Sequence, residues 1–226
     1  MRKIGLVGGI SWVSTIDYYR FINEGVNERL GGLNFAECLI YSLNFGDVQD
    51  KTWEGSFDLL LNACESLKRS GVEAIVLCAN TAHLFADQLE EKIALPIIHI
   101  GSETAKAINA AGIKNVGLLA TVFTMEKEFY TKKLEDYGLN VLVPAKKETR
   151  DYIQLTLKEE LGRGVIAEET KARYIKIVNE LIADGAEGII LGCTEIPMLI
   201  SQADFDIPVF DTTKIHCQAI VDYVLS

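Results

Sequence analysis

Two cysteines, Cys78 and Cys193, stand where the chain could do acid–base chemistry. Each ends an apolar, strand-like run and opens a polar segment that leads into a helix-like stretch. The two segments read Cys78-Ala79-Asn80-Thr81-Ala82-His83 and Cys193-Thr194-Glu195. Backbone N–H groups are free at such strand ends, so they can hold an anion. They also lower the pKa of a thiol from ~8.5 toward neutrality, so the pattern predicts two activated thiols.

Two such thiols suit proton transfer at a carbon atom. A free cysteine titrates at ~8.5, so thiol and thiolate can coexist near neutral pH. A thiolate could remove the proton from one face of an α-carbon while a thiol delivers a proton to the other face, as racemisation requires. The alternative for each cysteine alone is packing as a small buried hydrophobe. Two of them in similar contexts favour the catalytic interpretation.

The elements that must position these cysteines alternate between strands and helices. Apolar runs predict strands at residues 3–7, 37–43, 74–77 and 96–100. Amphipathic spacing predicts helices at residues 14–29 and 53–70, and a further helix ending near Lys92. This order predicts an α/β fold in which helices flank parallel sheets.

The pattern begins again in the second half of the chain. Ile4-Gly5-Leu6-Val7 returns as Val116-Gly117-Leu118-Leu119, and Tyr18 returns as Tyr130, each 112 residues later. Constant offsets indicate two copies of one α/β unit. Ligands of open α/β sheets bind beyond the carboxyl ends of the strands. We therefore predict two pseudo-symmetric three-layer α/β/α domains with mostly parallel sheets and the site in the interdomain cleft.

Composition disfavours several functional classes. The net charge of −10 over 226 residues disfavours nucleic acid as a partner, because an acidic surface repels phosphates. No apolar run approaches the ~20 residues that cross a bilayer, and no signal-peptide pattern is present, so we expect a cytoplasmic protein without a membrane partner. The five cysteines are an odd number, which argues against a disulfide framework. Cys38, Cys64 and Cys217 are interpreted as core thiols.

Neither a metal nor a cofactor is expected. His83, His99 and His216 are scattered along the sequence, and none has metal-ligand spacing with a cysteine pair. The first glycines, Gly5 and Gly8-Gly9, have the spacing G-x-x-G-G, which is not the fingerprint of dinucleotide binding.

Several longer motifs together carry a resemblance that covers nearly the whole chain. They are Ile4-Gly5-Leu6-Val7-Gly8-Gly9-Ile10-Ser11-Trp12, Arg29-Leu30-Gly31-Gly32-Leu33, Leu77-Cys78-Ala79-Asn80-Thr81-Ala82-His83, Thr121-Val122-Phe123-Thr124-Met125-Glu126, Leu191-Gly192-Cys193-Thr194-Glu195-Ile196 and Phe210-Asp211-Thr212-Thr213-Lys214-Ile215-His216. With these motifs the chain resembles the aspartate/glutamate racemase superfamily, in particular its bacterial amino-acid racemase branch. The resemblance implies a mechanism with two thiols and neither pyridoxal phosphate nor metal, a small amino-acid substrate, and usually a homodimer. It also implies a first domain of residues 1–98 plus 210–226 and a second of residues 99–209.

The resemblance also implies roles for the polar residues around the cysteines. Asn80, Thr81 and Thr194 would hold the α-carboxylate and amino group of the substrate. Ser11 and its counterpart Thr121 would line the pocket.

Two further residues each have two interpretations. Thr124 either lines the pocket or caps a helix. Glu195 either binds the amino group or is an acid favoured by the dipole at the start of a helix.

Departures from the family pattern leave the substrate open between aspartate, glutamate and neutral polar amino acids. Position 13 is Val13, where this branch often has an acid, and position 79 is Ala79, where it often has Thr. Aspartate-specific relatives use an Arg in the loop after the second strand and a Lys in the second half. Here the loop of residues 45–52 has no Arg, and its candidate binders of the substrate side chain are Gln49, Lys51 and Thr52. The corresponding stretch of the second half has Arg163 but no Lys.

Two other classes of function remain as alternatives. One is a thiol-dependent decarboxylase or cis–trans isomerase of a small diacid from the same superfamily. Decarboxylase relatives keep one of the two cysteines, so the presence of both favours racemisation. The other is a non-catalytic amino-acid-binding protein, which would need the anion-holding strand ends but not two thiols.

Overall fold

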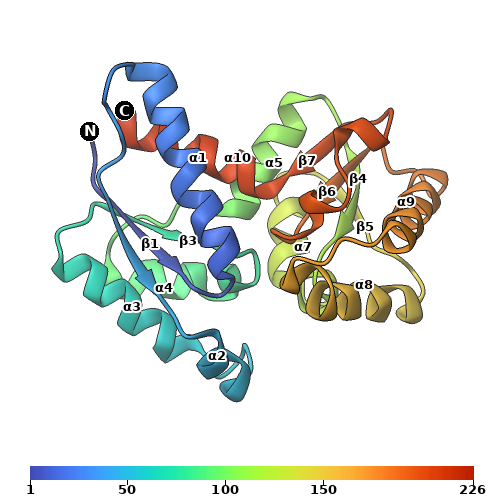
Figure 1. Ribbon diagram of the computed structural model, residues 1–226, viewed down its shortest axis with the longest axis horizontal. Coiled ribbons are helices and arrows are strands. Elements are labelled where there is room, and N and C mark those ends of the chain that lie inside the picture. The colour runs from blue at the N-terminus through green and yellow to red at the C-terminus, as the bar shows by residue number, and fades with distance from the viewer. The chain divides into compact units, whose positions relative to one another are not determined.

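The chain folds into two compact units, each built around a parallel sheet (Figure 1). The computed structural model describes all 226 residues. The first unit comprises Met1–Ile100 and Thr213–Ser226, and the second comprises Gly101–Thr212. No helix is long and apolar enough to span a bilayer.

The first unit holds a three-stranded sheet in the order β2-β1-β3. Its elements are β1 (Ile4–Gly8), α1 (Trp12–Leu30), β2 (Cys38–Ser42), α2 (Phe45–Lys51), α3 (Phe57–Arg69), β3 (Ala74–Leu77), the 3-10 helix η1 (Thr81–Phe85), α4 (Ala86–Ile93) and α10 (Thr212–Leu225). The chain therefore returns to its N-terminal unit for its last helix.

Alternation along the strands of this unit divides its core into two layers. Ile4 and Leu6 of β1 pack toward α1 and α10, whereas Val7 packs toward α3 and α4. Along β3, Val76 and Leu77 divide in the same way. Successive side chains of a strand point to opposite faces, so each face needs its own helical cover (Figure 1). The unit is thus a three-layer α/β/α structure.

The second unit holds a four-stranded parallel sheet in the order β5-β4-β6-β7. Its elements are α5 (Ile100–Ala110), β4 (Asn115–Leu119), α6 (Val122–Glu126), α7 (Glu128–Glu135), β5 (Asn140–Leu142), α8 (Lys147–Glu159), η2 (Leu161–Arg163), α9 (Glu168–Ala183), β6 (Gly188–Leu191), η3 (Ile196–Met198), η4 (Gln202–Asp204) and β7 (Val209–Asp211). The predicted α/β class with two parallel sheets is confirmed.

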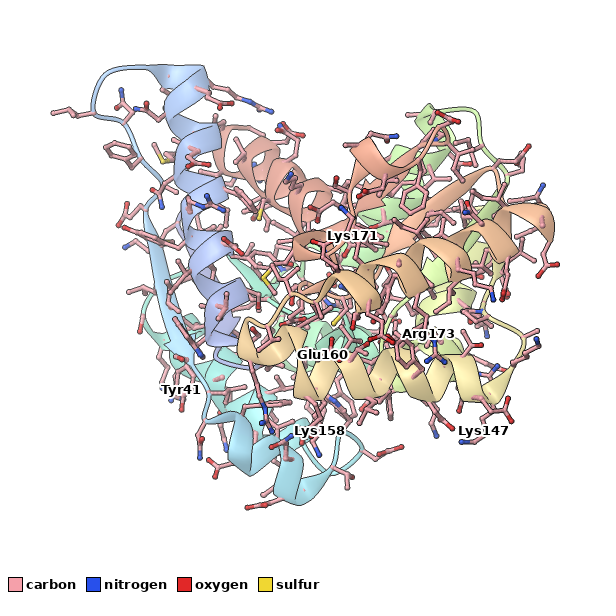
Figure 2. The ribbon with its side chains drawn as sticks, turned by 45° about the vertical axis from the view of Figure 1, so that its right-hand side comes forward. Tyr41, Lys147, Lys158, Glu160, Lys171 and Arg173 are labelled. Carbon is pink, nitrogen blue, oxygen red and sulfur yellow. The ribbon has the colours of Figure 1, made fainter.

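Side-chain contacts in the second unit join α8 to α9 on one side of the sheet (Figure 2). Thr170 donates to Glu160 at 2.6 Å, and the Arg173 guanidinium lies 3.5 Å from the centroid of the Tyr152 ring. Gly117 of β4 lies under α9, where an added Cβ would come within 3.1 Å of a Leu181 side-chain carbon. These contacts hold α9 closely against the sheet.

The fourth strand predicted for the first unit at residues 96–100 is shortened to a single parallel bridge beside β3. Only a single bridge joins Ile97 to Ile75, and α5 begins at Ile100. The backbone on either side of this bridge bonds to β3, since the Ile75 N–H donates to the Pro96 carbonyl at 2.9 Å and the Ile98 N–H donates to the Ile75 carbonyl at 3.2 Å. The next backbone groups bond to histidine side chains, so the pairing goes no further. Ile98 accepts from His216 Nε2 at 2.7 Å, and the Ile100 N–H donates to His83 Nε2 at 3.2 Å.

Residues 45–52, expected to be a loop, instead form α2 and its C-terminal cap. Asn44 caps this helix by accepting a hydrogen bond from the Gly46 N–H at 3.3 Å, and its side-chain amide donates to Asp47 at 3.0 Å. Thr52 ends the helix with a φ of 59°. An Asx-type cap of this kind stabilises a short helix that periodicity does not predict.

Candidate functional site

Cys78 directly follows β3 at the carboxyl edge of the first sheet. Its N–H donates to the Val7 carbonyl at 3.0 Å, which continues the pairing of Leu77 with Val7. Its side chain is 1% exposed and packs in the layer under α1 and α10. Burial raises the pKa of the Cys78 thiol, with a smaller contribution from Cys38.

Cys193 lies one position further beyond its strand than Cys78 does. In the second sheet Leu191 pairs with Leu119, and Gly192, rather than Cys193, donates its N–H to the Leu119 carbonyl at 2.7 Å. Gly192 therefore holds the place of Cys78. A Cβ there would lie 2.8 Å from a Leu118 methyl group, so this place has no room for a side chain. The prediction of matching strand ends is right to within one residue.

The Cys193 thiol is hydrogen-bonded to a carboxylate two residues away. Cys193 Sγ donates to Glu195 Oε2 at 2.9 Å, and Thr194 Oγ1 donates to the same oxygen at 2.9 Å. All three residues are half-buried. Burial raises the pKa of Cys193 well above its ordinary value, followed by the charge of Glu195 and its hydrogen bond. The backbone N–H groups of Glu195 and Thr194 act in the opposite direction.

The expectation that both thiols have a pKa lowered toward neutrality is therefore wrong. It relied on a helix N-terminus behind each cysteine. The stretches that follow are short 3-10 helices, with five residues in η1 and three in η3. So short a helix has almost no macrodipole to offset the desolvation of a buried thiolate.

Asn80 and Thr81 follow Cys78 and begin η1. They are 4% and 6% exposed, so both polar side chains lie within the folded chain beside the cysteine. The Asn80 carbonyl accepts from the His83 N–H at 3.1 Å, which closes the first turn of η1. This turn sets the direction of both side chains relative to Cys78.

Ser11 and Thr121 have the same local role in the two units. Ser11 caps α1 by accepting from the Ser14 N–H at 3.4 Å, and Thr121 caps α6 by accepting from the Thr124 N–H at 3.2 Å. The Thr121 hydroxyl also donates to the Thr124 hydroxyl at 3.0 Å. Both caps are half-buried, so capping accounts for the choice of hydroxyl residues after the first strand of each unit.

The family-model match covers residues 7–220 and is described as Asp/Glu/hydantoin racemase. The chain belongs to this racemase family. The broad specificity amino-acid racemase RacX of Bacillus subtilis is 23% identical over 231 residues, which cover 99% of this chain and 98% of RacX.

Two solved structures of racemase-type proteins match over 100% of both chains. A candidate Asp/Glu racemase from Yersinia pestis is 44% identical with a TM-score of 0.93. An aspartate racemase homologue from Pyrococcus horikoshii is 35% identical with a TM-score of 0.88. The two parallel sheets described above are those of the Asp/Glu racemase fold.

The side chains considered for substrate specificity in this racemase-family chain are exposed. Gln49 lies on α2, and Thr52, its cap, donates to Glu54 at 3.4 Å. Arg163 lies in η2 and forms an ion pair with Glu159 at 2.5 Å. A guanidinium already paired with Glu159 of α8 is a weak candidate for recognising a second substrate carboxylate.

The three histidines are not scattered in space but gather in the first unit. The His83 ring centroid lies 4.8 Å from that of His99 and 5.6 Å from that of His216. His83 Nδ1 donates to the Ala79 carbonyl at 2.9 Å, one residue after Cys78. Sequence reasoning missed this cluster, because 117 residues or more separate His216 from the other two and no local pattern marks their proximity.

Proposed function

We propose that the protein is a cofactor-independent amino-acid racemase that uses Cys78 and Cys193 as a paired acid and base. The observation that carries the proposal is that each unit has a thiol at the carboxyl edge of its parallel sheet. Ligands of α/β folds bind at this edge. A reaction that needs one proton-transfer group on each face of an α-carbon is the chemistry that two such thiols serve best.

The proposed reaction moves two protons and no other group. The thiolate of one cysteine takes the α-proton, so that an S–H bond forms and the Cα–H bond breaks. The electron pair left on Cα delocalises into the substrate carboxylate. The other thiol then gives its proton to the opposite face of Cα. Asn80, Thr81 and Thr194 are proposed to hold the substrate's polar groups, since they adjoin the two cysteines. Ser11, Thr121 and Glu195 are proposed to line the same site.

Aspartate and glutamate are the first substrates to test. Family membership supports an acidic amino acid, and the similarity to broad specificity RacX supports a wider range. We therefore propose a screen of both enantiomers of acidic and neutral polar amino acids for deuterium uptake at Cα in heavy water. Chiral chromatography of the same samples separates racemisation from simple exchange, and mass analysis would reveal decarboxylation.

The proposed mechanism predicts that Cys78→Ser and Cys193→Ser each lose racemisation by about 10²–10⁴-fold, because either variant lacks one of the two proton-transfer groups. Each variant should still exchange the α-proton of one enantiomer, and the two variants should prefer opposite enantiomers. Cys64→Ala is the matched control, since Cys64 packs on the other face of the sheet from Cys78. Full racemisation by either serine variant would contradict the two-thiol mechanism.

A homodimer is also part of the proposal. β2 is an edge strand, and its apolar side chains are partly exposed, including Tyr41 at 37% and Ile40 at 43%. Figure 2 labels Tyr41 on this strand. An exposed apolar edge strand is a common site of association between chains. Sedimentation equilibrium is expected to give twice the chain mass of 25.0 kDa.

A further inference from the structure

The carboxylate of Glu195 is held in place against the Cys193 thiol. Oε2 of Glu195 accepts from Cys193 Sγ and from Thr194 Oγ1, each at 2.9 Å. A carboxylate can only accept hydrogen bonds, so the thiol proton points at Oε2. The second donor, Thr194, fixes the carboxylate in this position. The geometry therefore favours the protonated form of Cys193.

Groups with opposite effects on the pKa of Cys193 surround its sulfur atom. The backbone N–H groups of Thr194 and Glu195 lower the pKa of Cys193, so they would stabilise a thiolate. Burial and the negative charge of Glu195 oppose them and dominate, which raises the pKa of Cys193. Removal of the Glu195 charge alone would leave the two N–H donors in place. A substitution of Glu195 can therefore change the pKa of Cys193 without removing these two donors.

Cys78 has a different environment. No carboxylate accepts a hydrogen bond from its thiol within its own unit, and burial among apolar side chains is the main reason that its pKa is raised. The two cysteines therefore differ in the acid beside Cys193 and in the two backbone N–H groups that act against it. The one-residue offset between Cys78 and Cys193 accompanies this difference, because Gly192 occupies the position that Cys78 has in its own sheet.

We propose that Glu195 is a positioning residue that keeps the proton on Cys193, so that Cys193 is the resting acid of the pair and Cys78 is the thiol that ionises first. The inference rests on the proposed racemase function, to which it adds an order of events. Once Cys78 has ionised, its thiolate takes the α-proton and Cys193 donates its own to the opposite face. This reactive form returns when the proton on Cys78 passes through water to the Cys193 thiolate.

The first test measures the pH at which each cysteine ionises in the unmodified protein. Alkylation by iodoacetamide is followed across pH, and the modified peptides are quantified by mass spectrometry. The midpoint of each profile reports ionisation, because accessibility changes the rate and not the midpoint. We expect the midpoint of Cys193 to lie above that of Cys78. A midpoint of Cys193 at or below that of Cys78 would overturn the inference.

The second test removes the charge and keeps the shape of residue 195. In Glu195→Gln the midpoint of Cys193 should fall by about one unit or more, which is at least about tenfold faster alkylation at a pH below both midpoints. Glu180→Gln, an exposed site on α9 of the same unit, is the matched control and should leave the midpoint unchanged. Glu195→Asp keeps the charge and should keep the midpoint of Cys193 above that of Cys78.

The outcomes separate this inference from the proposed function. An unchanged Cys193 midpoint in Glu195→Gln, together with normal racemisation by the unmodified protein, would overturn the role of Glu195 alone. No α-proton exchange with any amino acid would overturn the racemase proposal, whatever the alkylation profiles show. If Glu195→Gln does not fold, the order of midpoints in the unmodified protein still decides the assignment.

Discussion

His216 is a buried imidazole whose two ring nitrogens have different hydrogen-bond roles. Nε2 lies 2.7 Å from the Ile98 carbonyl, which can only accept, so Nε2 carries the proton. Nδ1 then accepts from the Tyr18 hydroxyl at 2.8 Å. Burial lowers the pKa of His216 to about 3, with a smaller contribution from His83. The residue is therefore a neutral link between α1, α10 and the segment before α5.

This link predicts a loss of stability in mild acid. The folded pKa of His216 is about 3 and lies below the unfolded value of 6.5, so the unfolded chain binds more protons between these pH values. The contribution of His216 is complete above pH ~6.5 and is lost as the pH falls toward 3. Between pH 7 and pH 5 we expect the free energy of unfolding to drop by about 2 kcal/mol from this group. Urea titrations of the unmodified protein and of His216→Asn at both pH values measure it. An equal drop in the two proteins would contradict the prediction.

In each unit, a residue with a hydroxyl side chain caps the helix that follows the first strand. Ser11 begins α1 and Thr121 begins α6. Just before Ser11, the backbone at Gly9 passes close to the backbone at Leu43. Gly9 has a φ of +84°, and an added Cβ would lie 2.2 Å from the Leu43 carbonyl oxygen. The chain can turn from β1 into α1 at this point because residue 9 has no side chain.

The capping role of Ser11 predicts that its effect on stability can be separated from any effect on catalysis. Ser11→Ala should lower the free energy of unfolding by about 1 kcal/mol, because the N-terminal N–H groups of α1 lose a side-chain acceptor. Ser11→Asn keeps a capping acceptor and should restore most of that loss. If Ser11 also binds substrate, Ser11→Asn will be stable yet raise the KM for α-proton exchange. Denaturant titrations and exchange kinetics on the two variants are the measurements. A Ser11→Ala protein as stable as the unmodified one would rule out the capping role.

At the scale of the whole molecule, the last helix completes the unit that contains the N-terminus. Cys217, Ile220, Val221 and Val224 of α10 are buried in the layer formed with α1 and one face of the first sheet. The core of the first unit therefore depends on residues at least 135 positions away along the chain from all three of its strands (212 − 77 = 135 for the nearest). The C-terminal segment is a structural part of that unit rather than a tail.

This arrangement predicts that a change near the C-terminus weakens the N-terminal strands. Ile220 is 0% exposed, so Ile220→Ala should lower the free energy of unfolding by about 2–5 kcal/mol through lost burial and a cavity. Hydrogen exchange should accelerate in β1 and α1 and change little in β4 and β6. Ile166→Ala, at a site 53% exposed, is the control and should stay within about 0.5 kcal/mol. Equal acceleration of hydrogen exchange throughout the chain would contradict the prediction that the two units have independent cores.

From the residues alone we could predict the alternation of strands and helices, the duplication and the places of Cys78 and Cys193 near the ends of two strands. These features depend on local periodicity and on spacing along the chain, which a single sequence contains. The element limits that it missed have local causes that periodicity does not include. The Asn44 side chain caps α2, and histidine side chains bond to the Ile98 carbonyl and the Ile100 N–H, where the strand predicted at residues 96–100 would have continued past its single bridge.

Three features became apparent only in the folded chain: the direction of the thiol pKa shifts, the gathering of the three histidines and the difference between Cys78 and Cys193. Each depends on burial and on which groups lie within a few ångströms, and these are set by packing between distant segments. Sequence spacing placed Glu195 near Cys193, but only the folded geometry brings its carboxylate to 2.9 Å from the sulfur. For this reason the candidate cysteines could be named from the sequence, whereas their states of protonation could not.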